Sequence, residues 1–99
     1  MTTRQLTFHP AAIAEAEEVS LWYSKRSELA ATRFVEEFKL TCRKILKSPG
    51  RWPESSKGTR HVKLPCFPFS IVYRIVGTRV EVIAVAHGHR RPEYWKERL

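Results

Sequence analysis

The residues best suited to chemistry lie in one short stretch near the end of the chain, residues 87–98 (HGHRRPEYWKER). This stretch contains four cationic side chains, two imidazoles and two aromatic rings. Guanidinium groups bind phosphates and carboxylates through paired hydrogen bonds, and aromatic faces stack on bases or other rings. The stretch therefore predicts an anion-binding patch that faces a target molecule. Its predicted target-binding residues are His87, His89, Arg90, Arg91, Tyr94, Trp95 and Arg98.

Parts of this stretch allow other interpretations. Trp95 is large and apolar enough to fold back as a lid on the open end of the core, with solvated cations around it. His87 and His89 would face the same side of an extended segment, as two zinc ligands do. A zinc site needs at least a third ligand, but the sequence has no Asp and no nearby Cys, and Glu93 is only a weak candidate. No metal and no other cofactor are therefore expected.

Cations on the predicted sheet could extend the patch. Arg60, His61 and Lys63 lie on one predicted strand and Arg74 on the next. Phosphoryl transfer without a metal needs such cations around the phosphate, together with an acid and a base. A charged sheet face is also typical of a surface that is merely solvated, so both interpretations stay open. The candidates for acid and base are His87, His89, Lys63 and Tyr94.

The first half of the chain predicts a strand followed by two helices. Residues 4–8 alternate in polarity as a half-buried strand does, and residues 11–26 and 28–47 have apolar residues at helical spacing. Ser27 is the predicted N-cap of the second helix. Two amphipathic helices joined by a turn form a helical hairpin. The apolar stripe of the second helix consists of Ala30, Phe34, Phe38, Cys42 or Thr41, Ile45 and Leu46.

The second half predicts three strands. After a loop at residues 49–58 the polarity period changes to two, which indicates strands at 59–64, 67–76 and 80–86. The last of these is so apolar that it should be a central strand covered on both faces. Residues 92–99 predict a short helical turn. The order β-α-α-β-β-β predicts an α+β fold, with the N-terminal helical hairpin packed on a small, mainly antiparallel sheet.

Length and charge limit the classes of protein to consider. With 99 residues the chain predicts a single domain over residues 1–99, and 42% hydrophobic residues are enough for a small core. The net charge of +8 favours an anionic partner, and residues 51–99 hold ten basic against four acidic side chains. No apolar run approaches the ~20 residues of a membrane span. Two cysteines are too few for a disulfide framework, so a reduced, cytoplasmic location is expected.

Several short motifs resemble those of a known family. His9-Pro10-Ala11 opens a helix that ends in Trp22-Tyr23, and Phe67-Pro68-Phe69 precedes Val72-Tyr73-Arg74. The chain ends in His-Gly-x-Arg-x-Pro-x-Tyr-Trp-x-x-Arg, from His87 to Arg98. Together these motifs resemble the RelE/ParE superfamily of toxins from type II toxin–antitoxin, or plasmid-stabilisation, modules. The ending is similar to the ParE-like side of that superfamily, and the resemblance covers nearly the whole chain.

The resemblance implies a growth-inhibiting toxin with one of two targets. ParE-like members inhibit DNA gyrase and are not known as nucleases, whereas RelE-like members cleave mRNA on the ribosome. The ending favours a gyrase inhibitor, so an enzymatic activity is left open with a preference against it. The remaining alternative is a small basic nucleic-acid-binding module without toxicity. For a metal-independent endoribonuclease, the catalytic candidates are Lys63, Arg74, His87, Arg90 and Tyr94.

The resemblance also implies partners. A cognate antitoxin should neutralise the toxin, through an acidic segment that folds on binding to apolar surface of the helices. Contact with operator DNA would occur only indirectly, through the antitoxin. The target partner would be DNA gyrase, or the ribosome with its mRNA, and no membrane partner is expected.

Overall fold

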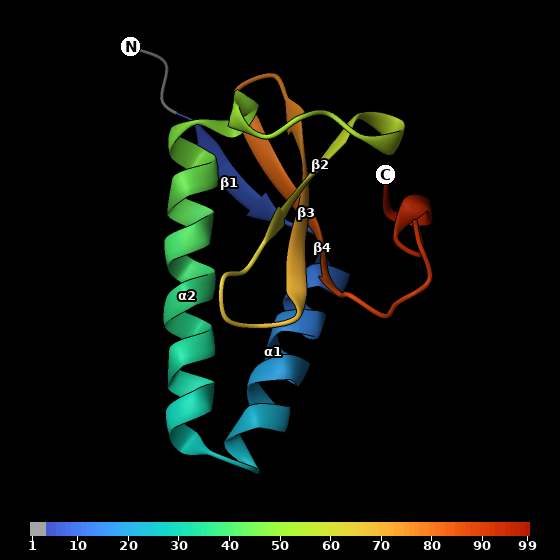
Figure 1. Cartoon of the computed structure of the whole chain (residues 1–99). Helices are drawn as coiled ribbons and strands as arrows, with labels where there is room; N and C mark the ends of the chain where they lie inside the picture. Colours follow the sequence, from blue (N-terminus) through green and yellow to red (C-terminus); the bar gives the residue numbers. More distant parts are fainter. Residues whose placement is uncertain (1–3) are drawn as a thin grey trace.

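A helical hairpin covers one face of a four-stranded sheet, and the C-terminal segment lies on the other side (Figure 1). The computed structural model describes residues 4–99. The sheet has the order β1-β4-β3-β2. The predicted order of elements and the α+β class are confirmed. The elements are β1 (Gln5–Phe8), α1 (Pro10–Ser24), α2 (Glu28–Lys47), β2 (Thr59–Lys63), β3 (Phe69–Val76) and β4 (Arg79–His87).

Side-chain caps begin both helices of the hairpin. The Nδ1 atom of His9 accepts a hydrogen bond from the backbone N–H of Ala11 at 3.0 Å, and Pro10 occupies the first position of α1. The hydroxyl of Ser27 accepts from the N–H of Ala30 at 3.2 Å, which confirms the predicted N-cap of α2. These caps satisfy N–H groups that a helix cannot satisfy itself.

The main core lies between the hairpin and the sheet. Phe34 of α2 is 1% exposed, and its ring lies 6.0 Å from that of Tyr23 on α1 and 5.9 Å from that of Phe69 on β3. Phe38 is half-buried and stacks 6.1 Å from Phe34. The predicted packing of this stripe on the sheet is therefore confirmed. Buried apolar area of this kind is the main stabilising contribution to a domain of this size.

Strand β4 is central, as predicted. It pairs antiparallel with β3, and it pairs in parallel with β1, whose direction the sequence left open. One extra residue, Ile83, interrupts its register opposite the step from Val72 to Tyr73. Such a bulge changes which face the next residues occupy. Val82 and Val85 consequently belong to the main core, whereas Ile83 and Ala84 form a second, smaller apolar cluster with Val72 and Trp95.

The connections differ in detail from the sequence prediction. The predicted loop at residues 49–58 contains two short 3-10 turns, η1 (Pro49–Arg51) and η2 (Ser56–Gly58). The third strand begins at Phe69 and not at residue 67, since Pro68 has no N–H for the ladder. Within residues 92–99 the helical turn is the 3-10 turn η3 (Lys96–Arg98). Over residues 4–99, no helix has both the length and the apolar character needed to cross a bilayer.

Candidate target-binding site

The C-terminal segment, residues 88–99, is attached to the sheet by a buried tryptophan. Trp95 is 2% exposed and packs against Val72 and Ile83 on the face opposite the helices. Its ring meets that of His61 edge to face at 5.7 Å, and desolvation lowers the pKa of His61 below its usual range. Trp95 therefore takes the position of a lid on the core, as the second interpretation of the sequence described.

A single carboxylate from α1 holds the other side of the segment. The two oxygens of Glu15 accept bonds from the Arg98 guanidinium at 2.8 and 3.0 Å, and one of them also accepts from the Tyr94 hydroxyl at 2.7 Å. The same carboxylate accepts from the N–H of Val85 at 3.0 Å. Arg98 also donates to the carbonyl of Ile83 at 3.0 Å. Strand β1 pairs with β4 only up to Val82. Beyond that point, Glu15 and Arg98 supply the hydrogen-bond partners of the Val85 N–H and the Ile83 carbonyl of β4.

This network changes the acidity of its members. Burial alone would raise the pKa of Glu15, but the hydrogen bonds from Arg98, Tyr94 and the Val85 N–H outweigh it, and the pKa lies below the ordinary carboxyl value. Burial and the neighbouring carboxylate raise the pKa of Tyr94 well above that of a free phenol. Glu15 is therefore ionised and Tyr94 protonated at neutral pH, which is the pairing that their hydrogen bond requires.

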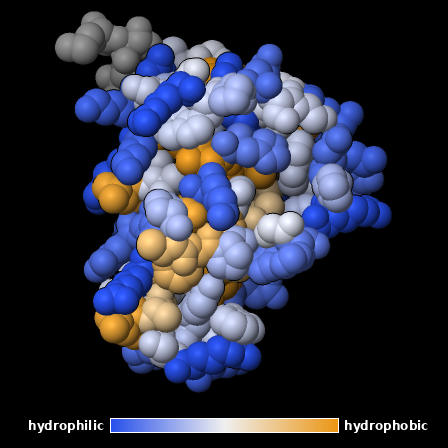
Figure 2. Space-filling view, viewed as in Figure 1, coloured by the Kyte–Doolittle hydropathy of each residue, from blue (hydrophilic) through white to orange (hydrophobic). Residues whose placement is uncertain are grey.

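A cationic cleft opens beside this network. It has a volume of about 340 Å³ and lies between the C-terminal segment, β2 and the start of β3. The guanidinium of Arg90 lies over the Tyr94 ring, 3.9 Å from its centre, and Arg91 follows it in the wall. The side of the molecule that carries this segment is predominantly hydrophilic (Figure 2). The residues lining the cleft are Ser55, Ser56, His61, Ser70, Ala86, His87, Gly88, Arg90, Arg91, Pro92, Glu93, Tyr94 and Trp95.

The two imidazoles at the end of β4 contact each other. The backbone N–H of His89 donates to Nδ1 of His87 at 3.0 Å, and the two rings lie 5.2 Å apart. The Phe69 ring also meets the His87 ring edge to face, with 5.1 Å between the ring centres. Within residues 4–99, no group of three His, Cys, Asp or Glu side chains forms a ligand set for a metal ion.

The structure brings only part of the predicted residues together. His87, Arg90, Arg91 and Tyr94 line the cleft, whereas Trp95 contributes to it from a buried position. The Arg98 guanidinium pairs with Glu15 on the α1 side. Two of the ribonuclease candidates do not line the cleft: Lys63 is exposed on β2, and Arg74 forms an ion pair with Glu81 at 2.8 Å.

Sequence reasoning missed Glu15 as part of the site. In the sequence it is one of three glutamates in the same helix, and nothing distinguishes it from Glu17 or Glu18. It also missed three serines of the cleft wall, because they come from a loop and from a strand start far from residues 87–98. The missed lining residues are Ser55, Ser56 and Ser70.

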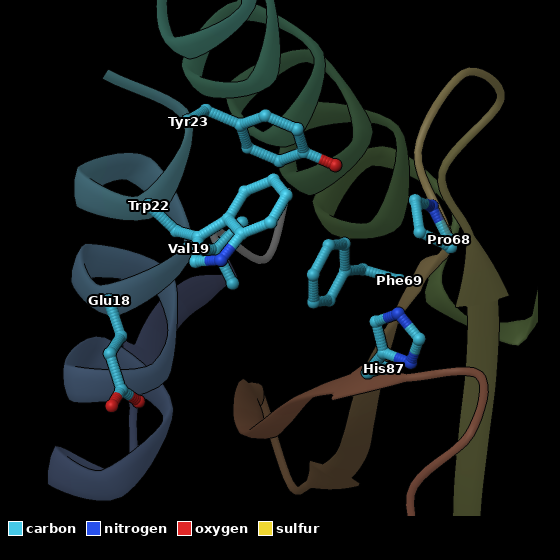
Figure 3. Close-up of a pocket in the computed structure, with 7 residues that line it drawn as sticks. All are labelled: Glu18, Val19, Trp22, Tyr23, Pro68, Phe69 and His87. Carbon is cyan, nitrogen blue, oxygen red and sulfur yellow. The ribbon is translucent and has the colours of Figure 1, made fainter. Parts of the chain in front are cut away.

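A second hollow lies on the other side of His87, between α1 and the sheet, with a volume of about 450 Å³. Figure 3 shows the rings of Trp22 and Phe69 directed toward each other across it, with His87 beside Phe69 and the Glu18 carboxylate pointing away. Trp22 is 51% exposed, and Arg26 stacks on its ring at 3.6 Å. We refer to this hollow as the aromatic groove. Its lining residues are Glu18, Val19, Trp22, Tyr23, Pro68, Phe69 and His87.

Comparison with known proteins identifies the family. Residues 6–92 match the family model described as ParE toxin of the type II toxin–antitoxin system, parDE. The chain belongs to the ParE toxin family. No curated protein matches the sequence.

Solved structures of the superfamily share the fold of this ParE-family chain. A structure described as the chromosomal ParDE TA system from P. aeruginosa superposes with a TM-score of 0.77 at 18% identity, over 88% of this chain and 98% of that one. A double mutant of the E. coli toxin RelE in the free state superposes with a TM-score of 0.67 at 17% identity, over 97% and 93% of the two chains. The isolated E. coli RelE toxin gives 0.63 at 20% identity, over 95% and 93%.

Proposed function

We propose that this ParE-family toxin acts in the cytoplasm as an inhibitor of DNA gyrase and that the cationic cleft contacts the target. The match of residues 6–92 to the ParE model is the observation that carries the choice of target. The cleft supports the choice of surface, because Arg90 and Arg91 follow the end of the central strand β4 and line its wall. Cations placed on such a scaffold give both affinity and a fast approach to an anionic partner.

Inhibition of gyrase needs binding and not a reacting group. The side chains at the cleft fit that requirement, since the Tyr94 hydroxyl already donates to Glu15 and its raised pKa opposes loss of the proton. Arg74, which the ribonuclease hypothesis needs, is paired with Glu81 outside the cleft. These contacts favour a binding surface over a catalytic centre.

The test compares the two targets with one preparation of the chain. Purified protein is added to gyrase in a supercoiling assay and, in parallel, to ribosomes that carry a defined mRNA. We expect inhibition of supercoiling without cleavage of the mRNA, and we expect the double variant Arg90→Ala with Arg91→Ala to lose most of the inhibition while remaining folded. Cleavage of ribosome-bound mRNA would replace this proposal by the RelE-like alternative, and DNA binding without either effect would favour the non-toxic module.

We further propose that the aromatic groove receives an apolar residue of the cognate antitoxin. A toxin of a type II system has an antitoxin partner, and α1 presents its outer apolar residues to solvent, with Leu21 56% and Trp22 51% exposed. An acidic antitoxin segment would also meet the positive charge of Arg90 and Arg91, which lie beyond His87. The antitoxin would then dock in the aromatic groove and cover the neighbouring cationic cleft.

This second proposal has a matched pair of variants on one helix. Trp22→Ala removes a groove wall, and Leu21→Ala removes a side chain of similar exposure that does not line the groove. We expect Trp22→Ala to weaken antitoxin binding at least about tenfold, as the loss of a buried aromatic anchor does, and Leu21→Ala to change it little. Equal effects of the two variants, measured by titration calorimetry with the antitoxin encoded beside the toxin, would contradict the assignment.

A further inference from the structure

Glu15 is the point at which the helical hairpin contacts the segment that forms the cationic cleft. Its carboxylate is 13% exposed and receives bonds from Tyr94, Arg98 and the Val85 N–H. None of these partners is nearer than 70 residues in the sequence. A carboxylate of this kind is saturated with donors, so it has no remaining capacity for a ligand of its own.

The contacts continue from Glu15 to the cleft. Glu15 holds the hydroxyl of Tyr94 at 2.7 Å, and the ring of Tyr94 supports the guanidinium of Arg90 at 3.9 Å. Arg98 approaches the same ring at 5.2 Å while its guanidinium binds Glu15 with two nitrogens. The orientation of the Tyr94 ring, and with it the position of Arg90, is therefore set from α1.

We propose that Glu15 is a positioning residue of the target-binding cleft, which orients Arg90 through Tyr94. This inference rests on the proposed function of the cleft. Two independent anchors hold the C-terminal segment: Trp95 attaches it to the sheet through apolar burial, and Glu15 sets its orientation through directed hydrogen bonds. Removal of the carboxylate leaves the first anchor in place, so the segment stays attached while Tyr94 and Arg90 lose their fixed geometry.

The decisive variant is Glu15→Gln. An amide keeps the shape of the side chain but removes the charge and replaces one acceptor oxygen by an NH₂ group, which faces the donors of Tyr94 and Arg98. Glu17→Gln is the matched control, because Glu17 lies on the same helix, is exposed and lines neither the cleft nor the aromatic groove. Tyr94→Phe is the second variant, since it retains the ring beneath Arg90 and removes only the hydroxyl that Glu15 holds.

The first readout is spectroscopic and does not depend on toxicity. In the wild-type chain the side-chain protons of Arg90 should be shifted upfield by the Tyr94 ring, and NMR detects this directly. We expect Glu15→Gln to remove most of that shift and Tyr94→Phe to reduce it, while Glu17→Gln leaves it unchanged. Circular dichroism should show that all three variants remain folded. An unchanged Arg90 shift in Glu15→Gln would overturn the inference.

The second readout is inhibition of gyrase. We expect Glu15→Gln to weaken it by roughly tenfold, the effect of misplacing one charge-assisted contact. If the Arg90 shift is lost and inhibition stays at the wild-type level, Glu15 does not position a residue that matters, and the inference is wrong. If the wild-type chain does not inhibit gyrase at all, the proposed function fails, and the NMR comparison alone still decides whether Glu15 orients Arg90.

Discussion

Replacement of Trp95 by alanine should destabilise the fold strongly. Trp95 is 2% exposed and is the largest residue in the apolar cluster with Val72, Ile83 and Ala84. A buried tryptophan removes roughly 200 Å² from water, which at about 25 cal/mol per Å² corresponds to about 5 kcal/mol. The methyl group that alanine retains and partial collapse of the site lower the expected loss to about 3–4 kcal/mol. Domains of this size have a free energy of unfolding of ~5–15 kcal/mol in total.

Urea denaturation followed by circular dichroism measures this loss. With a slope of about 1–1.5 kcal/mol per M, the midpoint should fall by about 2–4 M. Trp22→Ala is the matched control, because Trp22 is 51% exposed, and its replacement should cost less than about 1 kcal/mol. A loss below about 1 kcal/mol for Trp95→Ala would refute the reasoning, since Trp95 would then behave as an exposed residue available to a target.

Three further predictions concern ionisation, thiol reactivity and helix capping. The lowered pKa of Glu15 stabilises the folded state above the ordinary carboxyl range, ~pH 4, and this contribution is lost as the pH falls through the pKa of Glu15 in the folded state. Glu15→Gln should therefore flatten the acid limb of a plot of unfolding free energy against pH. An unchanged acid limb would contradict this. Burial raises the pKa of Cys42 to about 12, so a thiol reagent at pH 8 should label the exposed Cys66 quickly and Cys42 only after unfolding. Mass spectrometry measures the two labelling rates, and equal rates would contradict the burial of Cys42. Ser27→Ala should cost about 1 kcal/mol in urea denaturation through the loss of the α2 cap, and Ser24→Ala, whose hydroxyl only donates to the carbonyl of Leu21, should cost clearly less.

Local patterns in the sequence determined the elements and their order. The apolar stripe of α2 repeats at helical spacing through Phe34, Phe38 and Ile45. The stripe could be predicted from residues three and four apart in the sequence. The Ser27 cap and the change to a period of two after residue 58 are equally local signals. The same is true of the dense charge of residues 87–98, which located the cleft wall containing Arg90 and Arg91. These features could be predicted because the residues that make them are neighbours in the chain.

Only the tertiary structure decided how these elements meet. The parallel pairing of β1 with β4, the Ile83 bulge that directs Ile83 and Ala84 toward Trp95, and the ion pair of Arg98 with Glu15 join residues that are far apart in sequence. The sequence does not distinguish a buried tryptophan from an exposed one, or a glutamate with all its hydrogen bonds made within the protein from a solvated one. What separates Trp95 from Trp22, and Glu15 from Glu17, is the set of atoms that the fold brings against each side chain, because burial and hydrogen bonding are properties of that surrounding and not of the residue type.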